Sequence, residues 1–162
     1  MIHLEQTVFA IQSASEDLIE LALSVAIPGN TEDRDKLDAE VHSTMLELMA
    51  AVILSRGRLC AGHQAFLQII LKRPNANMTD ERIINDYGAR WAQHHHRIPV
   101  FFQRAIDSDI RRRTRVAASM LCLIQLIGNN CAITDGDFNP SEQHLIRDYI
   151  TRLHCHMESA LL

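Results

Sequence analysis

The chain has 162 residues, of which 47% are apolar and 22% are charged, and this combination predicts one soluble globular domain over residues 1–162. Its net charge of −4 lacks the basic excess of a phosphate-binding protein, and aromatic residues make up only 5% of the chain. A nucleic-acid partner is therefore not expected.

The N-terminus and the apolar segments predict a cytoplasmic protein without membrane insertion. The segment MIHLEQTVFAIQSASEDL has acidic residues early and no basic flank, unlike a signal or transit peptide. The most apolar stretch, 116–133, is interrupted by Ser119 and Gln125 and is too short for a bilayer of roughly 30 Å. The four cysteines form no CxxC pair, which indicates reduced thiols in the core of a cytosolic protein.

The first half of the chain has helical periodicity, and nowhere does the sequence alternate long enough to predict a strand. Two short helices are predicted over 3–12 and 13–27, the second opening with a capping box at Ser13. Thr31 is predicted to cap a long helix over 31–56.

The middle of the chain continues with short helices. One is predicted over 61–72, and Thr79 is predicted to cap the next, which ends in three histidines. Pro99 suits the first position of a helix that ends at residue 107. Ser108 or Asp109 then begins another long helix.

The last two helices complete an all-α bundle of about seven or eight helices. The helix that begins near residue 108 becomes apolar on every face by Met120, which predicts a central position. The final helix runs from Pro140 to near Glu158, with Asn139 as its N-cap and Glu142 as the capping-box partner.

An internal repeat appears when the chain is shifted by 79 residues, which places Gly57 on Gly136. Apolar positions of the two preceding helices then coincide: Val41, Met45, Leu48 and Val52 fall on Met120, Ile124, Ile127 and Cys131. The pattern predicts two helical hairpins packed about a pseudo-two-fold axis. A chance match between two amphipathic hairpins is the alternative.

The turn between the last two helices carries a family resemblance. The segment ITDGDFNPSEQHLIRDYI, 133–150, resembles the TerB-like tellurite-resistance family through Asp135, Gly136, Phe138 and Glu142. The resemblance implies an all-helical bundle, a bacterial source and a role in tellurite resistance or stress response, with no established catalytic reaction. It also implies that the acidic turn binds a metal or a partner.

The first copy of the repeat departs from this pattern. Arg56 and Arg58 replace the two aspartates of the turn, and His63 replaces the glutamate. A symmetrical two-acid site is therefore excluded. If the two turns are close in space, the arginines can pair with Asp135 and Asp137 in planar, bidentate geometry.

A weak divalent-metal site is the alternative interpretation of the acidic turn. Its oxygen ligands would come from Asp135, Asp137, Asn139 and Glu142, fewer than Ca²⁺ or Mg²⁺ prefers. A solvated turn without metal or ion pairs is the third interpretation.

The nine histidines and one arginine cluster offer further candidates. His63, Glu142 and His144 would converge if the turns meet, whereas isolated surface histidines are the commoner case. Asp38 and His42 share a helix face but are only two ligands. The cluster in DSDIRRRTR predicts a solvated face, with a docking patch for an acidic partner as the alternative.

These features favour a function without catalysis. No HExxH, GxSxG, P-loop or GxGxxG motif occurs, and no cofactor is predicted. We expect a cytoplasmic interaction module of a bacterial tellurite-resistance or stress system, with a protein partner and a homodimer as one alternative for its assembly. The alternatives are a divalent-metal-binding protein that uses the 135–142 turn, and an enzyme whose site is assembled from scattered residues.

Overall fold

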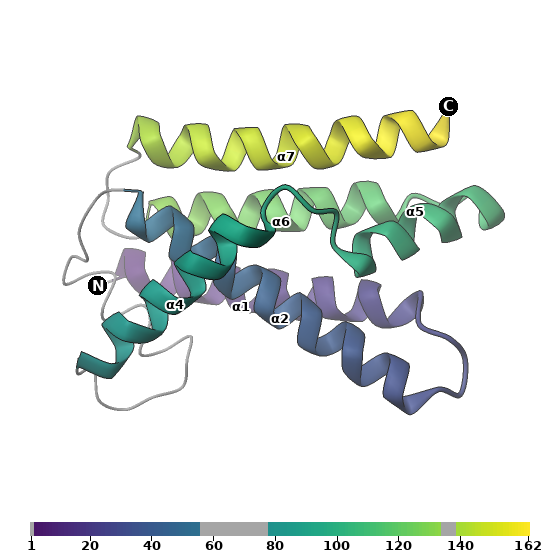
Figure 1. Ribbon diagram of the computed structural model, residues 1–162, viewed down its shortest axis with the longest axis horizontal. Helices are drawn as coiled ribbons and strands as arrows, with labels where there is room; N and C mark the ends of the chain where they lie inside the picture. Colours follow the sequence, from purple (N-terminus) through teal and green to yellow (C-terminus); the bar gives the residue numbers. More distant parts are fainter. Residues whose placement is uncertain (1, 56–77, 134–138) are drawn as a thin grey trace.

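A computed structural model describes residues 2–55, 78–133 and 139–162. This part of the chain forms six helices and no strand, which confirms the all-α prediction (Figure 1). The helices are α1 (Ile2–Ser24), α2 (Thr31–Leu54), α4 (Met78–His94), α5 (Val100–Arg112), α6 (Val116–Ala132) and α7 (Pro140–Leu161). The helix predicted over 61–72 lies outside the described residues.

The two helices predicted over 3–12 and 13–27 are one continuous helix, α1, so the predicted break at Ser13 is wrong. An apolar stripe continues across this position and is buried: Val8, Ile11, Ala14, Leu18 and Ala22. Burial of the stripe against α6 outweighs the local capping signal.

Helix starts differ from the predictions by one or two residues. Asn30, not Thr31, is the N-cap of α2, because its Oδ1 accepts from the Asp33 N–H at 3.0 Å. The helix α4 begins at Met78, before Thr79, and Pro99 is the N-cap residue of α5. The predicted start of α7 is confirmed, since the Asn139 Oδ1 accepts from the Ser141 N–H at 2.8 Å.

The predicted helix start at Ser108 or Asp109 is wrong, because α5 continues to Arg112 and α6 begins at Val116. The buried carboxylate of Asp109 nevertheless caps α6 from within the preceding helix. It accepts from the backbone N–H groups of Val116 and Ala117, both at 2.9 Å, and from the Thr114 hydroxyl. The cap therefore comes from seven and eight residues upstream instead of from the adjacent residue.

The predicted central position of α6 is confirmed, since this helix packs against α1, α2, α5 and α7. One side of α6 still reaches solvent, where Cys122 and Leu126 are exposed. The expectation of core cysteines is correct for Cys131 and wrong for Cys122 and Cys155, which are exposed. Among the described helices, none is both long and apolar enough to cross a bilayer.

The first helices of the predicted repeat share one property in the structure. All eight apolar residues that the shift pairs between α2 and α6 are buried, and the two helices pack against each other. The turns at Gly57 and Gly136 lie outside the described residues, as does the 61–72 helix. The repeat as a whole therefore stays a prediction.

Candidate functional site

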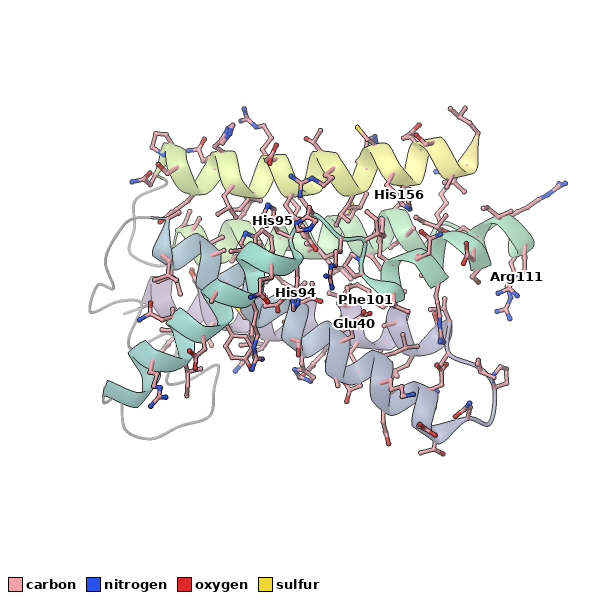
Figure 2. The ribbon with its side chains drawn as sticks, viewed as in Figure 1. Glu40, His94, His95, Phe101, Arg111 and His156 are labelled. Carbon is pink, nitrogen blue, oxygen red and sulfur yellow. The ribbon has the colours of Figure 1, made fainter. Side chains whose placement is uncertain are left out.

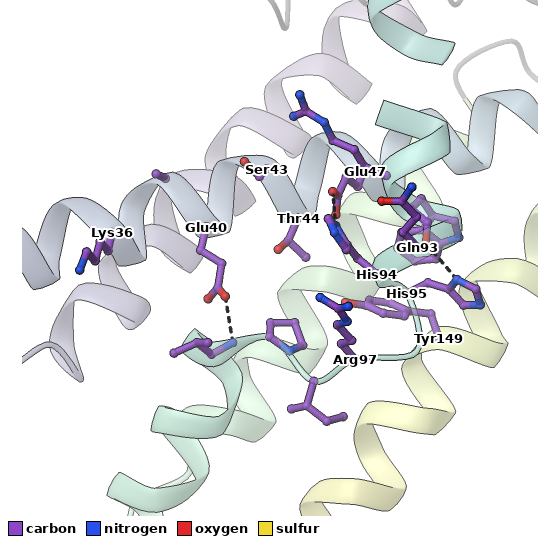
Figure 3. A pocket seen from close by; sticks show the side chains of 16 residues that line it. Lys36, Glu40, Ser43, Thr44, Glu47, Gln93, His94, His95, Arg97 and Tyr149 are labelled. Atoms are coloured by element: carbon purple, nitrogen blue, oxygen red, sulfur yellow. Dashed lines mark hydrogen bonds and ion pairs between the residues drawn. The ribbon is translucent and has the colours of Figure 1, made fainter. Parts of the chain in front are cut away.

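An open groove of about 790 Å³ lies between α2, α4, the 95–99 connection and the start of α5, with Tyr149 of α7 at one side (Figure 3). Glu40, His94, His95 and Phe101 cluster in the middle of the bundle around it (Figure 2). Its polar and charged lining residues are Lys36, Glu40, Ser43, Thr44, Glu47, Arg90, Gln93, His94, His95, Arg97 and Tyr149. The apolar lining includes Trp91, Ile98 and Val100.

Helical spacing explains the α2 side of the groove. Glu40, Thr44 and Glu47 are separated by four and three residues, so they share one face of α2. An adjoining face carries Val41, Met45 and Val52 into the core. The same helix therefore supplies both a core face and a line of polar groups.

Glu40 joins α2 to the start of α5. Its Oε1 accepts from the Phe101 N–H at 2.7 Å, and its Oε2 accepts from the Val100 N–H at 3.0 Å. A helix start leaves several N–H groups without intrahelical partners, and Pro99 has no side chain that could cap them. The carboxylate is thus a cap contributed by a different helix.

Glu47 and His94 form the second contact across the groove. The buried Glu47 Oε1 lies 2.9 Å from His94 Nδ1, and the carboxylate side chain is only 8% exposed. Because a buried carboxylate requires a partner, His94 at the end of α4 fixes α4 against α2. The pair is drawn with a dashed line in Figure 3.

His95 and two aromatic rings connect the end of α4 to α7. The His95 ring stacks on Trp91 with centroids 5.7 Å apart, and its Nδ1 lies 2.9 Å from the Trp91 carbonyl oxygen. Trp91 in turn contacts the Tyr149 ring, with the ring centroids 4.7 Å apart. Arg152 donates from Nη1 to the His95 carbonyl oxygen at 2.8 Å, which closes the link.

The Tyr149 phenol is held neutral. Burial raises its pKa above the ordinary value of 10.0, and the negative charges of Glu47 and Glu40 raise it further. A neutral phenol can donate a hydrogen bond but is a poor nucleophile or base at neutral pH.

The histidine predictions are partly confirmed. The run His94–His96 lies at the C-terminus of α4 as expected, but His94 and His95 are partly buried and hydrogen-bonded instead of isolated on the surface. His154 pairs with Glu158 at 3.4 Å and His156 contacts Gln103 at 2.7 Å, so these two histidines have different partners, as their spacing predicts.

Two other predicted histidine sites have members within the described residues. Asp38 and His42 form an exposed pair at 3.6 Å, as their spacing predicts. His144 is exposed on α7. Of its predicted neighbours, Glu142 is buried at the start of the same helix, and His63 lies outside the described residues.

The described residues include the end of the acidic turn, whereas Asp135 and Asp137 lie outside them. Asn139 acts as the N-cap of α7, and Glu142 is fully buried in its first turn. Arg56, Arg58 and His63 also lie outside the described ranges. Over residues 2–55, 78–133 and 139–162, no group of three potential metal ligands occurs. The metal site and the arginine–aspartate pairs therefore remain predictions.

The two glutamates that organise the groove, Glu40 and Glu47, are not among the site residues predicted from the sequence. Glu47 had a recognisable signal, because it is the only charged residue in the otherwise apolar run MLELMAAVIL. A charged residue inside such a run requires a buried partner. Glu40 had no such signal, because its partners are backbone groups 60 and 61 residues further along the chain.

Comparison of the chain with protein-family models, curated proteins and solved structures finds no match. The TerB-like resemblance therefore remains an expectation based on the 133–150 segment. The groove belongs to a class of open recesses in which the carboxylates form hydrogen bonds to neighbouring helices.

Proposed function

We propose that the protein is a cytoplasmic, non-enzymatic interaction module, and that the groove between α2, α4 and the start of α5 receives a segment of a protein partner. The observation that carries this proposal is that the groove's titratable groups are engaged in holding the fold together. Glu40 caps α5, Glu47 holds His94, and the Tyr149 phenol is neutral. These groups already have structural roles.

The hydroxyl groups in the groove do not form an activated nucleophile. Nucleophilic catalysis by serine or threonine requires a base within hydrogen-bonding distance of the hydroxyl. Within the described chain, no hydrogen bond joins Ser43 or Thr44 to His94. Binding accounts for the arrangement better than acyl transfer does.

The lining suits a peptide segment. Trp91 and Ile98 are partly buried, and the Val100 side chain is 53% exposed at the edge of the groove. Ser43, Thr44 and Gln93 add hydrogen-bonding groups beside these apolar surfaces. A segment with one apolar side chain and free backbone amides matches this mixture.

The biological setting belongs to the same proposal. The resemblance to the TerB-like family implies a bacterial tellurite-resistance or stress-response system, in which an interaction module would connect proteins. The 135–142 turn keeps the divalent-metal alternative as a separate prediction.

Site-specific crosslinking in cells tests the groove. A photoreactive amino acid replaces Val100 at the groove edge, and a second variant carries it at Phe9, an exposed apolar position on α1 outside the groove lining. We expect a defined crosslinked partner from position 100, absent from position 9 and lost when Ser43→Arg fills the groove. The same products from both positions, or products unaffected by Ser43→Arg in a folded variant, would reject the groove as the binding site.

A further inference from the structure

Four arginines are exposed where α5 turns into α6: Arg111, Arg112, Arg113 and Arg115. We call this set the arginine corner. It lies at one end of the bundle, where Figure 2 shows Arg111 pointing away from the helices. Within the described residues, none of the four forms an ion pair. Positive charge is therefore concentrated here in a chain whose net charge is −4.

The corner has a fixed shape. Both oxygens of the buried Asp109 are used inside the turn, on the backbone of Val116 and Ala117. Arg113 has a left-handed backbone with φ 56°, and no other non-glycine residue in the described ranges has a positive φ. The arginines therefore project from an ordered turn, which lowers the entropy lost when a partner binds.

An apolar recess of about 450 Å³ adjoins the corner, between the α1–α2 connection and α5. Ile27 and Ile110 line it and are 52% and 53% exposed. Arg104 and Arg111 also line it, and Asp107 is the acidic residue of this lining.

A hydrogen-bonded ion pair holds the two walls of this recess together. The carboxylate of Asp33 accepts from the Arg104 guanidinium on α5 and, at 2.8 Å, from the Ile27 N–H in the connection. The recess is therefore a built feature of the fold. It places two half-exposed isoleucines next to Arg111, which forms no ion pair with any other described residue.

We infer that the arginine corner and this recess dock an acidic segment of a protein partner, with glutamate or aspartate on the arginines and an aliphatic side chain between Ile27 and Ile110. This inference rests on the proposed function and adds that the partner carries a negatively charged segment. Guanidinium groups bind carboxylates in bidentate geometry. The recess has an aliphatic lining of Val25, Ile27 and Ile110 that suits an aliphatic side chain, which favours a polypeptide over the flat surface of a bilayer.

Fluorescence anisotropy with a short labelled peptide, glutamates flanking a central leucine, tests this inference on the full chain. We expect salt-sensitive binding that weakens about tenfold in Arg111→Glu/Arg112→Glu, since each reversed rim charge removes a favourable contact and adds a repulsive one. The matched control is Arg147→Glu, an exposed arginine of α7, which should change the affinity less than about twofold. A peptide with glutamine in place of glutamate should bind much more weakly.

Several results would overturn the inference. They are absence of peptide binding, an unchanged affinity in Arg111→Glu/Arg112→Glu, or arginine-dependent binding of anionic phospholipid vesicles in place of the peptide. If peptide binding were lost in Ser43→Arg but not in Arg111→Glu/Arg112→Glu, the acidic segment would bind in the groove, and the proposed function would still hold. Peptide binding at the corner without any Val100 crosslink would instead reject the groove.

Discussion

The carboxylate of Glu40, in the middle of α2, caps the first turn of α5 by accepting the Phe101 N–H at 2.7 Å. The same carboxylate accepts the Val100 N–H at 3.0 Å. A negative charge at this end of a helix also interacts favourably with the helix dipole. One side chain thus positions the two elements that form the edge of the groove.

Removing this cap should weaken the whole bundle. We expect Glu40→Ala to lower the free energy of unfolding by about 1–2 kcal/mol, because two N–H groups lose their acceptor. The unfolding free energy of Glu40→Gln should lie between those of the wild type and Glu40→Ala, since an amide has only one acceptor oxygen. Urea denaturation measures both. Glu32→Ala, which removes an exposed acid of the same helix paired with Lys36, should cost less than about 1 kcal/mol. Equal losses in Glu40→Ala and Glu32→Ala would contradict the capping role.

Two neighbouring histidines should behave differently. His94→Ala leaves the buried Glu47 carboxylate without its partner, and we expect a loss of about 1–3 kcal/mol in unfolding free energy. His96→Ala, two residues away and exposed, should stay within about 0.5 kcal/mol of the wild type. Adding Glu47→Gln to His94→Ala should restore part of the loss, since no buried charge remains. A double variant less stable than His94→Ala would count against this pairing.

The Asp33–Arg104 pair should make the stability of the protein fall at acidic pH. The pKa of Asp33 lies below its ordinary value of 3.8, mainly through the hydrogen bond from Arg104 and then through the Ile27 N–H. A carboxyl group whose folded pKa is lowered stabilises the protein above the unfolded pKa, and this contribution is lost as the pH falls through the folded value. Melting temperatures at pH 7 and pH 2.5, the second chosen to lie roughly below the ordinary carboxyl pKa, should show a smaller difference between wild type and Asp33→Asn at the acidic pH. A difference that is the same at both values would refute the linkage.

The left-handed residue at the arginine corner offers a stabilising change. Glycine adopts φ 56° without the steric penalty that Arg113 carries, so Arg113→Gly should raise stability by up to about 1 kcal/mol. Arg112→Gly makes the same chemical change one residue earlier, at the last residue of α5, and should lower stability by up to about 1 kcal/mol. Comparing the thermal unfolding of the two variants separates the effect of the backbone conformation from the effect of the lost charge. Identical shifts for both variants would mean that charge, not conformation, decides.

The three described cysteines should differ in reactivity. Burial raises the pKa of the Cys131 thiol, and the nearby charge of Glu142 raises it further, so little thiolate forms. Cys122 and Cys155 are exposed. We expect iodoacetamide to modify Cys122 and Cys155 in the native protein and Cys131 only after unfolding, as measured by peptide mass spectrometry. Rapid native modification of Cys131 would contradict its burial between α6 and α2.

The sequence by itself determined the helical class, the start of α7 at Asn139, and the apolar faces that meet in the core, including Met120 and Ile124. These features depend on contacts within a few residues of the chain or on a period that the helix itself imposes. Local patterns could therefore predict them.

Only the tertiary structure decided where α1 and α5 continue and which glutamates shape the groove. The Ser13 capping signal is overridden because the buried stripe of α1 packs on α6. Glu40 and Glu47 act on residues 47 to 61 positions away. Hydrogen bonds of that range form only after the helices have packed, because the packing core alone brings the distant backbone and side-chain groups within about 3 Å.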